Sequence, residues 1–131
     1  DTYDPNDLGF LRANNERSTR LEIGYRNFNP NFLNLNKFFS NFSISNERLY
    51  APNLYGGTYW RGNLTMISNH FNAMGLRFNG TIGEVNDYFE PRVWEENFIR
   101  PVWTTSRAWI STNYQKPFAI DLVHLIEVTH Y

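Results

Sequence analysis

The chain has 131 residues, the size of one domain, with a formal net charge of −1 and no cysteine. This charge balance excludes the strongly basic surface typical of nucleic-acid binding, and a chain without cysteine has neither a disulfide framework nor thiolate metal sites. Aromatic residues make up 18% of the chain, charged residues 19%, and eighteen residues are asparagine, a composition that suits an antiparallel sheet with one wet, uncharged face.

Turn-forming residues predict an ordered loop over residues 1–18. Within this loop Asp4, Asn6 and Asp7 alternate oxygen ligands, as calcium loops do, so calcium is the metal that the sequence suggests here. The loop lacks the glycine and the distal glutamate of an EF-hand, and Asp-Pro-Asn-Asp is also an ordinary turn. No cofactor is therefore expected, with a calcium ion as the alternative.

The first two strands are predicted at about 19–27 and 32–45, where apolar and polar residues alternate with the two-residue period of a β-strand. In the second strand the apolar residues change parity after Leu35. Such a change inside one strand predicts a β-bulge, which we expect near 37–39.

The third and fourth strands are expected at about 58–71 and 74–84, on either side of a two-residue hairpin turn at 72–73. The fourth strand alternates most regularly, so one of its sides is apolar and the other polar. We expect the apolar side to face lipid through Met74, Leu76, Phe78 and Ile82.

A fifth strand, at about 102–113, follows the longest and most charged connection of the chain. Its two tryptophans share parity with an arginine, and flat aromatic rings beside hydrogen-bonding groups are typical of sugar-binding surfaces. The expected ligand site consists of Trp103, Arg107 and Trp109. Packing of both tryptophans against a plug or a neighbouring strand is the alternative.

The sixth strand is expected at about 118–129, with Phe118, Ile120 and Leu122 facing lipid. No segment shows a convincing helical period or eighteen consecutive apolar residues, so no transmembrane helix is expected. The predicted fold class is therefore all-β, an antiparallel up-and-down meander of about six strands.

The connections between these strands suggest a membrane topology. Outer-membrane barrels join their strands by short periplasmic turns and long extracellular loops in alternation. Six strands do not close a barrel, whose smallest form has about eight. We therefore expect residues 1–131 to be a single β-barrel segment, a portion of a larger protein. The short turns are expected at 28–31, 72–73 and 114–117, and the long connections at 46–57 and 85–101.

Four motifs occur in order along the chain: Tyr-Asp-Pro-Asn-Asp-Leu-Gly-Phe-Leu-Arg-Ala-Asn-Asn at 3–15, Leu-Asn-Leu-Asn at 33–36, Asp-Tyr-Phe-Glu-Pro-Arg at 87–92 and Phe-Ala-Ile-Asp-Leu at 118–122. Through them nearly the whole chain resembles the C-terminal β-barrel domain, of unknown function, in a Gram-negative outer-membrane family whose members also carry an N-terminal carbohydrate-binding family-nine-like domain. The resemblance implies a larger parent protein, an outer-membrane location and a link to glycans, and it supplies no catalytic residues.

The expected function is an outer-membrane β-barrel segment with a transport, anchoring or surface-scaffold role. Its expected partners are the lipid bilayer, the remaining strands of the parent barrel or a partner chain, and a glycan, but not nucleic acid. The alternative is a soluble carbohydrate-binding β-sandwich that is secreted or periplasmic. An enzyme is not expected, because no catalytic constellation is visible. Glycoside hydrolysis by paired carboxylates is a third hypothesis, and its candidates are Glu84, Asp87, Glu90, Glu95 and Glu96.

Overall fold

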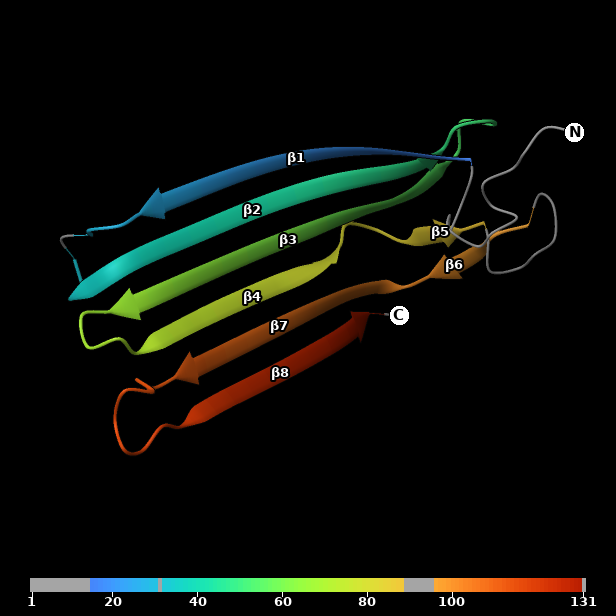
Figure 1. Ribbon diagram of the computed structural model, residues 1–131. Helices are drawn as coiled ribbons and strands as arrows, with labels where there is room; N and C mark the ends of the chain where they lie inside the picture. The colour runs from blue at the N-terminus through green and yellow to red at the C-terminus, as the bar shows by residue number, and fades with distance from the viewer. Residues whose placement is uncertain (1–14, 31, 89–95, 131) are drawn as a thin grey trace, which may run out of the picture.

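The computed structural model describes residues 15–30, 32–88 and 96–130, and these residues form two antiparallel sheets (Figure 1). The larger sheet has six strands in the order β1-β2-β3-β4-β7-β8, and β5 pairs with β6 in the smaller one. The all-β antiparallel fold is confirmed, because each long strand pairs with the long strand that follows it in the chain. The bounds are β1 Glu16–Asn27, β2 Leu35–Leu49, β3 Tyr55–Ser68, β4 Ala73–Thr81, β5 Val85–Asp87, β6 Phe98–Arg100, β7 Val102–Ser111 and β8 Asp121–His130.

One face of the large sheet is predominantly apolar. Residues directly opposite each other in an antiparallel pair share a face, so the strand registers assign each side chain to one side. A row of Phe38, Met66, Met74, Ile110 and Leu122 crosses the sheet from β2 to β8 on this side. We call this face the apolar wall; its other large members are Leu21, Ile23, Tyr25, Phe42, Ile44, Trp60, Leu64, Leu76, Phe78, Ile126 and Val128.

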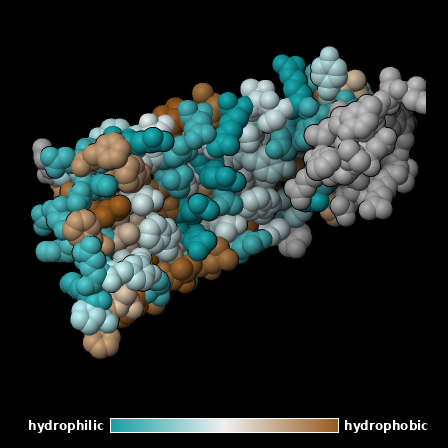
Figure 2. Space-filling view, viewed as in Figure 1, coloured by the Kyte–Doolittle hydropathy of each residue, from teal (hydrophilic) through white to brown (hydrophobic). Residues whose placement is uncertain are grey.

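The opposite face carries most of the charged residues of the long strands, and we call it the polar wall; Arg17 and Arg48, opposite each other, lie on the apolar side. In Figure 2 hydrophilic side chains gather over the middle of the face turned to the viewer. Two apolar residues of β8, Val123 and Leu125, share this face opposite Trp109 and Arg107. The polar and charged members include Glu16, Arg20, Glu22, Arg26, Lys37, Asn41, Ser43, Ser45, Glu47, Tyr59, Arg61, Asn63, Thr65, Arg77, Asn79, Thr105, Arg107, Asp121 and Glu127.

The connections at the two ends of the sheet differ in kind. Three hairpin turns, those of β1–β2, β3–β4 and β7–β8, lie together at one end (Figure 1). The β2–β3 connection and the small β5–β6 sheet lie at the other end. Successive strands of the meander therefore run in opposite directions between these two ends.

The strict alternation of short and long connections that the sequence predicts is wrong. The polar segment expected to form a long loop at 46–57 is mostly strand, because Glu47 pairs with Gly57 and Arg48 with Tyr55. Polar composition suggested a loop here, but polar side chains also occupy the wet face of a sheet. The connections observed between the long strands cover 28–34, 50–54, 69–72, 82–101 and 112–120.

Two strands are shorter than the alternation of the sequence suggests. β8 begins at Asp121, so Phe118 and Ile120 lie in the preceding turn, where Phe118 is 88% exposed. Ile120 still donates its N–H to the Thr112 side-chain oxygen at 2.7 Å. β4 ends at Thr81, and Ile82 follows it directly. The alternating pattern therefore continues beyond the strand ends, where Ile82 still donates its N–H to the Thr58 carbonyl and Ile120 accepts a bond from the Thr112 N–H.

The bulge that the parity change predicts is present at the beginning of β2. The register with β3 shifts between Leu35, which pairs with Ser68, and Lys37, which pairs with Ile67. Asn36 is the extra residue, so the bulge lies at the edge of the predicted range. Because of it Leu35 comes onto the same side of the sheet as Phe38, and Leu35 is only 5% exposed.

The sheet is open, and few of its side chains are buried. The accessible surface of the chain is 10,230 Å², whereas folded monomers of this mass expose about 7,200 Å². Among the described residues, Leu35 and Val85 are the buried hydrophobic side chains. β1 and β8 are the two free edges, so these six strands do not close on each other. The described part of the chain contains no helix long and apolar enough to cross a membrane.

Candidate functional site

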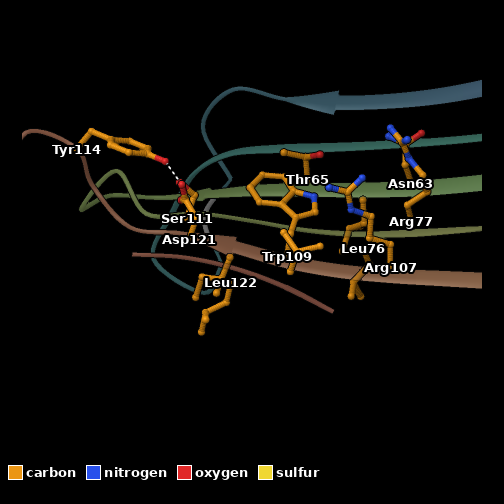
Figure 3. Close-up of a pocket in the computed structure, with 13 residues that line it drawn as sticks. Asn63, Thr65, Leu76, Arg77, Arg107, Trp109, Ser111, Tyr114, Asp121 and Leu122 are labelled. Carbon is orange, nitrogen blue, oxygen red and sulfur yellow. Dashed lines mark hydrogen bonds between the residues drawn. The ribbon is translucent and has the colours of Figure 1, made fainter. Parts of the chain in front are cut away.

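The polar wall contains an open hollow of about 480 Å³ that brings together two residues of the expected ligand site, Arg107 and Trp109. Both lie on β7, and β4 supplies Arg77 beside them. Figure 3 shows Trp109 and Thr65 on one side of the sheet and Leu122 on the other. The hollow is lined by Asn63, Leu64, Thr65, Leu76, Arg77, Arg107, Trp109, Ile110, Ser111, Tyr114, Asp121, Leu122 and Val123.

The position of Trp109 depends on Gly75, the residue directly opposite on β4. A Cβ atom at Gly75 would lie 2.4 Å from the indole Nε1 and 2.5 Å from Cε2. The indole therefore occupies the space that any larger side chain at this position would fill. This packing holds the ring across the sheet, beside the guanidinium groups of the hollow, rather than free in solution.

Three arginines lie next to one another on the polar wall, and we call them the arginine cluster: Arg61, Arg77 and Arg107. Arg77 is directly opposite Arg107 in the β4–β7 pair, a position in which Cβ atoms are about 4.5–5.5 Å apart. Arg61 is opposite Asn79, so it is the diagonal neighbour of Arg77. All three are exposed. Like charges directly opposite each other destabilise a sheet unless an anion compensates them.

No carboxylate of the polar wall forms an ion pair with this cluster among the described residues, although Asp121 lines the hollow of Arg77 and Arg107, and Glu47 lines that of Arg61. Glu22 forms an ion pair with Arg20 at 2.9 Å and accepts a hydrogen bond from the Asn41 amide at 2.5 Å. Asp121 accepts a hydrogen bond from the Tyr114 hydroxyl. Within residues 15–30, 32–88 and 96–130, no ion pair involves any arginine of the cluster.

Trp103, the third residue of the expected ligand site, belongs to a different hollow. Six residues separate it from Trp109 on β7, which is about 20 Å along an extended strand. Its hollow of about 370 Å³ lies between Trp60, Arg61 and Gly80 toward the other end of the polar wall. The structure therefore brings together Arg107 and Trp109 but not Trp103.

The residues expected to face lipid divide into two groups. Met74, Leu76, Phe78 and Leu122 lie in β4 and β8 on the apolar wall, and Phe78 is 41% exposed. An apolar hollow of about 600 Å³ lies beside the first two of them. Ile82, Phe118 and Ile120 lie just outside these strands, in the connections, and all three are exposed.

The expected calcium loop and the acidic connection form no site among the described residues. Asp4, Asn6 and Asp7 lie outside the described residues, as does Glu90 of the acidic connection. Asp87 forms an ion pair with Arg100 at 2.6 Å, across the small β5–β6 sheet. No group of three or more metal-ligating side chains occurs in the part of the chain that the structure describes.

Sequence reasoning did not find Arg77 and Asn63 as members of the site. Arg77 belongs to the regular strand β4, where it was one of several polar alternating residues. The connection from β4 to β7 covers 82–101 and leaves the register between these strands undetermined by the sequence. No local signal places Arg77 opposite Arg107.

Comparisons with known proteins place the chain in a family without assigning it an activity. No curated protein matches it, and no solved structure matches it. The family model that matches, over residues 1–130, is described as a domain of unknown function, DUF5916. This match supports one part of the resemblance that the four motifs indicate, namely that the chain is a domain of unknown function. Because the match covers nearly the whole chain, this protein belongs to the DUF5916 family.

Proposed function

We propose that this chain is a segment of a bacterial outer-membrane β-barrel, with its apolar wall against lipid and its polar wall toward the lumen. Its role is transport, anchoring or surface scaffolding for a larger parent protein, with a link to glycans. The observation that carries the proposal is the separation of the two walls, which is most regular in β4, whereas β8 carries apolar side chains on both faces. In an outer-membrane barrel, strands alternate apolar side chains outward with polar side chains inward.

The length and exposure of the strands support this proposal. Transmembrane β-strands need about 9–11 residues, and the six long strands have between 9 and 15 residues. On the apolar wall Leu21 is 62% exposed, Ile23 65% and Leu122 61%. No second layer of the described chain covers this wall. Lipid tails are an environment in which such a surface is stable without a second protein layer.

Aromatic side chains at the turn end of the sheet support a membrane boundary there. Phe38 contacts Tyr25 and Phe32 edge to face, with ring centroids 6.0 and 5.6 Å apart. Phe28 contacts Phe39 in the same way at 5.6 Å. These residues flank the β1–β2 turn, which lies beside the other two hairpin turns (Figure 1). Aromatic girdles at the lipid–water interface are typical of such barrels.

The free edges β1 and β8 support the presence of further strands. All ten residues of β8 are exposed, and this edge carries apolar side chains on both faces, including Val123 and Leu125 on the polar wall. Soluble proteins protect long edge strands with charges, prolines or bulges. The remaining strands of the parent barrel, or those of a partner chain, would satisfy both edges.

Cysteine labelling of β4 tests the proposal. In the full-length parent protein, single cysteines at Leu76 and Phe78 should carry fluorophores that lipid-borne quenchers reach. Cysteines at Arg77 and Asn79 should instead react with water-soluble thiol reagents, because alternate residues of a strand point to opposite faces. Equal behaviour at odd and even positions would contradict the membrane assignment.

A soluble carbohydrate-binding module is the second candidate, and the hollow that contains Trp109 favours it. An aromatic ring beside arginine, asparagine and threonine side chains is an arrangement that recognises sugars. Under this alternative the apolar wall would be covered by a second sheet of protein. A parent protein that remains in the aqueous phase without detergent would support the second candidate and contradict the first.

A further inference from the structure

We propose that the arginine cluster and Trp109 form a binding site for a saccharide that carries carboxylate groups. The inference deepens the proposed function, since it names the ligand class for the wall that would face the lumen. It starts from the position of Arg77 directly opposite Arg107. Like charges on directly opposite residues repel each other, and an anion bound between them turns the repulsion into attraction.

The described part of the chain does not itself provide this anion. Glu22 is held by Arg20 and Asn41, and Asp121 is held by Tyr114. Glu127 lies opposite Thr105, diagonal to Arg107, and forms no ion pair with it within the described residues. Arg77 and Arg107 therefore present positive charge, without an ion pair among the described residues, to an open hollow of about 480 Å³, whereas Arg61 lines the hollow of Trp103.

The chemistry of arginine favours a carboxylate. The guanidinium group is planar and offers parallel N–H donors that match the two oxygens of a carboxylate, so each arginine can bind one in a bidentate manner. Arg61 is the diagonal neighbour of Arg77 on β3, which extends the positive surface across three strands. A ligand with several carboxylates at regular spacing fits such a row better than a single small anion does.

The neutral side chains of the hollow favour a sugar as the carrier of these carboxylates. Trp109 supplies an amphipathic ring, on which the apolar face of a sugar can pack. Asn63 is opposite Arg77 on β3, and Thr65 is opposite Gly75, so an amide and a hydroxyl lie next to the ring and the charges. These groups can exchange hydrogen bonds with sugar hydroxyls. An oligosaccharide of uronic acids combines all the features that the site recognises.

Titration of the full-length parent protein, in detergent if extraction requires it, tests the inference. The probe is an oligogalacturonate, followed by calorimetry, and it is compared with the neutral oligogalactose of equal length, inorganic phosphate and polyglutamate. The oligogalacturonate should bind, and each of Arg77→Gln, Arg107→Gln and Trp109→Ala should weaken its binding about tenfold or more. Arg26→Gln is the matched control, because Arg26 lies on the same wall opposite Phe39, outside this hollow. It should change the affinity less than about twofold.

Thermal stability of the same variants separates binding from folding. Since Arg77 and Arg107 repel each other, Arg77→Gln should leave the melting temperature unchanged or raise it. A lower melting temperature would mean that carboxylates elsewhere in the parent protein already neutralise the pair, and it would overturn the inference. Equal binding of phosphate, polyglutamate or the neutral oligosaccharide would overturn it as well.

The binding experiment and the labelling of β4 test the ligand assignment and the membrane assignment separately. Absence of oligogalacturonate binding, with the alternating labelling of β4 intact, overturns the ligand assignment alone. Selective binding together with equal labelling at odd and even positions overturns the membrane assignment alone.

Discussion

Phe78 and Asn79 are neighbours in β4, and the backbone sends their side chains to opposite walls. Under the proposed membrane assignment, arginine at Phe78 would place a charge against lipid, which costs about 2–4 kcal/mol at the bilayer midplane. Arginine at Asn79 should be nearly neutral, because it lies beside other polar groups. Urea-induced unfolding of the parent protein in lipid vesicles measures both free energies. Similar losses for Phe78→Arg and Asn79→Arg would contradict the assignment of the two walls.

Gly75 offers a second test at the scale of single residues. Its missing side chain leaves the space in which the Trp109 indole lies. Gly75→Ala should therefore destabilise the protein by about 1–3 kcal/mol through overpacking. The same change in a Trp109→Ala background should cost much less, which gives a coupling of about 0.5–3 kcal/mol.

Gly24→Ala is the matched control for this prediction. Gly24 also lies on the polar wall, but its nearest neighbour would be the Asn41 amide nitrogen at 3.7 Å, an ordinary contact. The free energy of unfolding should be almost unchanged. If Gly75→Ala behaves like Gly24→Ala, the indole does not lie where the structure places it.

At the scale of an element, the bulge in β2 decides on which wall Leu35 lies. Deleting Asn36 removes the extra residue, and a shift of one residue sends a side chain to the other face of a strand. Leu35 would lose its burial, which is worth about 1.5–3 kcal/mol for a leucine side chain. Denaturant unfolding of the deletion variant measures this loss. Asn36→Ala keeps the bulge and should change stability by less than about 0.5 kcal/mol, so equal effects of both changes would contradict this role of the bulge.

The elements also show why the loops were predicted less well than the strands. The hydrophobic pattern of β4 places its side chains correctly because alternation is a property of neighbouring residues. The end of β2 and the beginning of β3 were taken for a loop because their residues are polar. Cross-strand pairings extend these strands, among them Glu47 with Gly57 and the hydrogen bond from the Leu49 N–H to the Leu54 carbonyl at 2.9 Å.

At the scale of the whole molecule, the open sheet exposes apolar side chains on one wall and along the β8 edge. Figure 2 shows hydrophobic side chains along the lower margin of the sheet, where Figure 1 places β8. Residues 1–131 produced alone should therefore aggregate in aqueous buffer and become monodisperse only with detergent. Size-exclusion chromatography with light scattering checks this prediction. A monodisperse monomer without detergent would contradict it and favour the soluble carbohydrate-binding alternative.

The sequence by itself determined the class of the fold and the two-sided character of the sheet. The alternation that separates Leu76 and Phe78 from Arg77 and Asn79 is set by the geometry of a single strand. The parity change after Leu35 marked the bulge for the same reason. The sequence also predicts that Arg107 and Trp109 lie on the same face of the sheet, because they are two residues apart in one strand.

The tertiary structure alone decided which strands' residues meet. Arg77 comes to lie opposite Arg107, and Gly75 opposite Trp109, only through the register of β4 with β7. The connection between these strands covers 82–101, and a connection of that length leaves many registers open. The separation of Trp103 from the hollow of Trp109 follows from distance along the strand. Local periodicity therefore assigns a side chain to a wall, whereas long-range backbone pairing assembles the site on that wall.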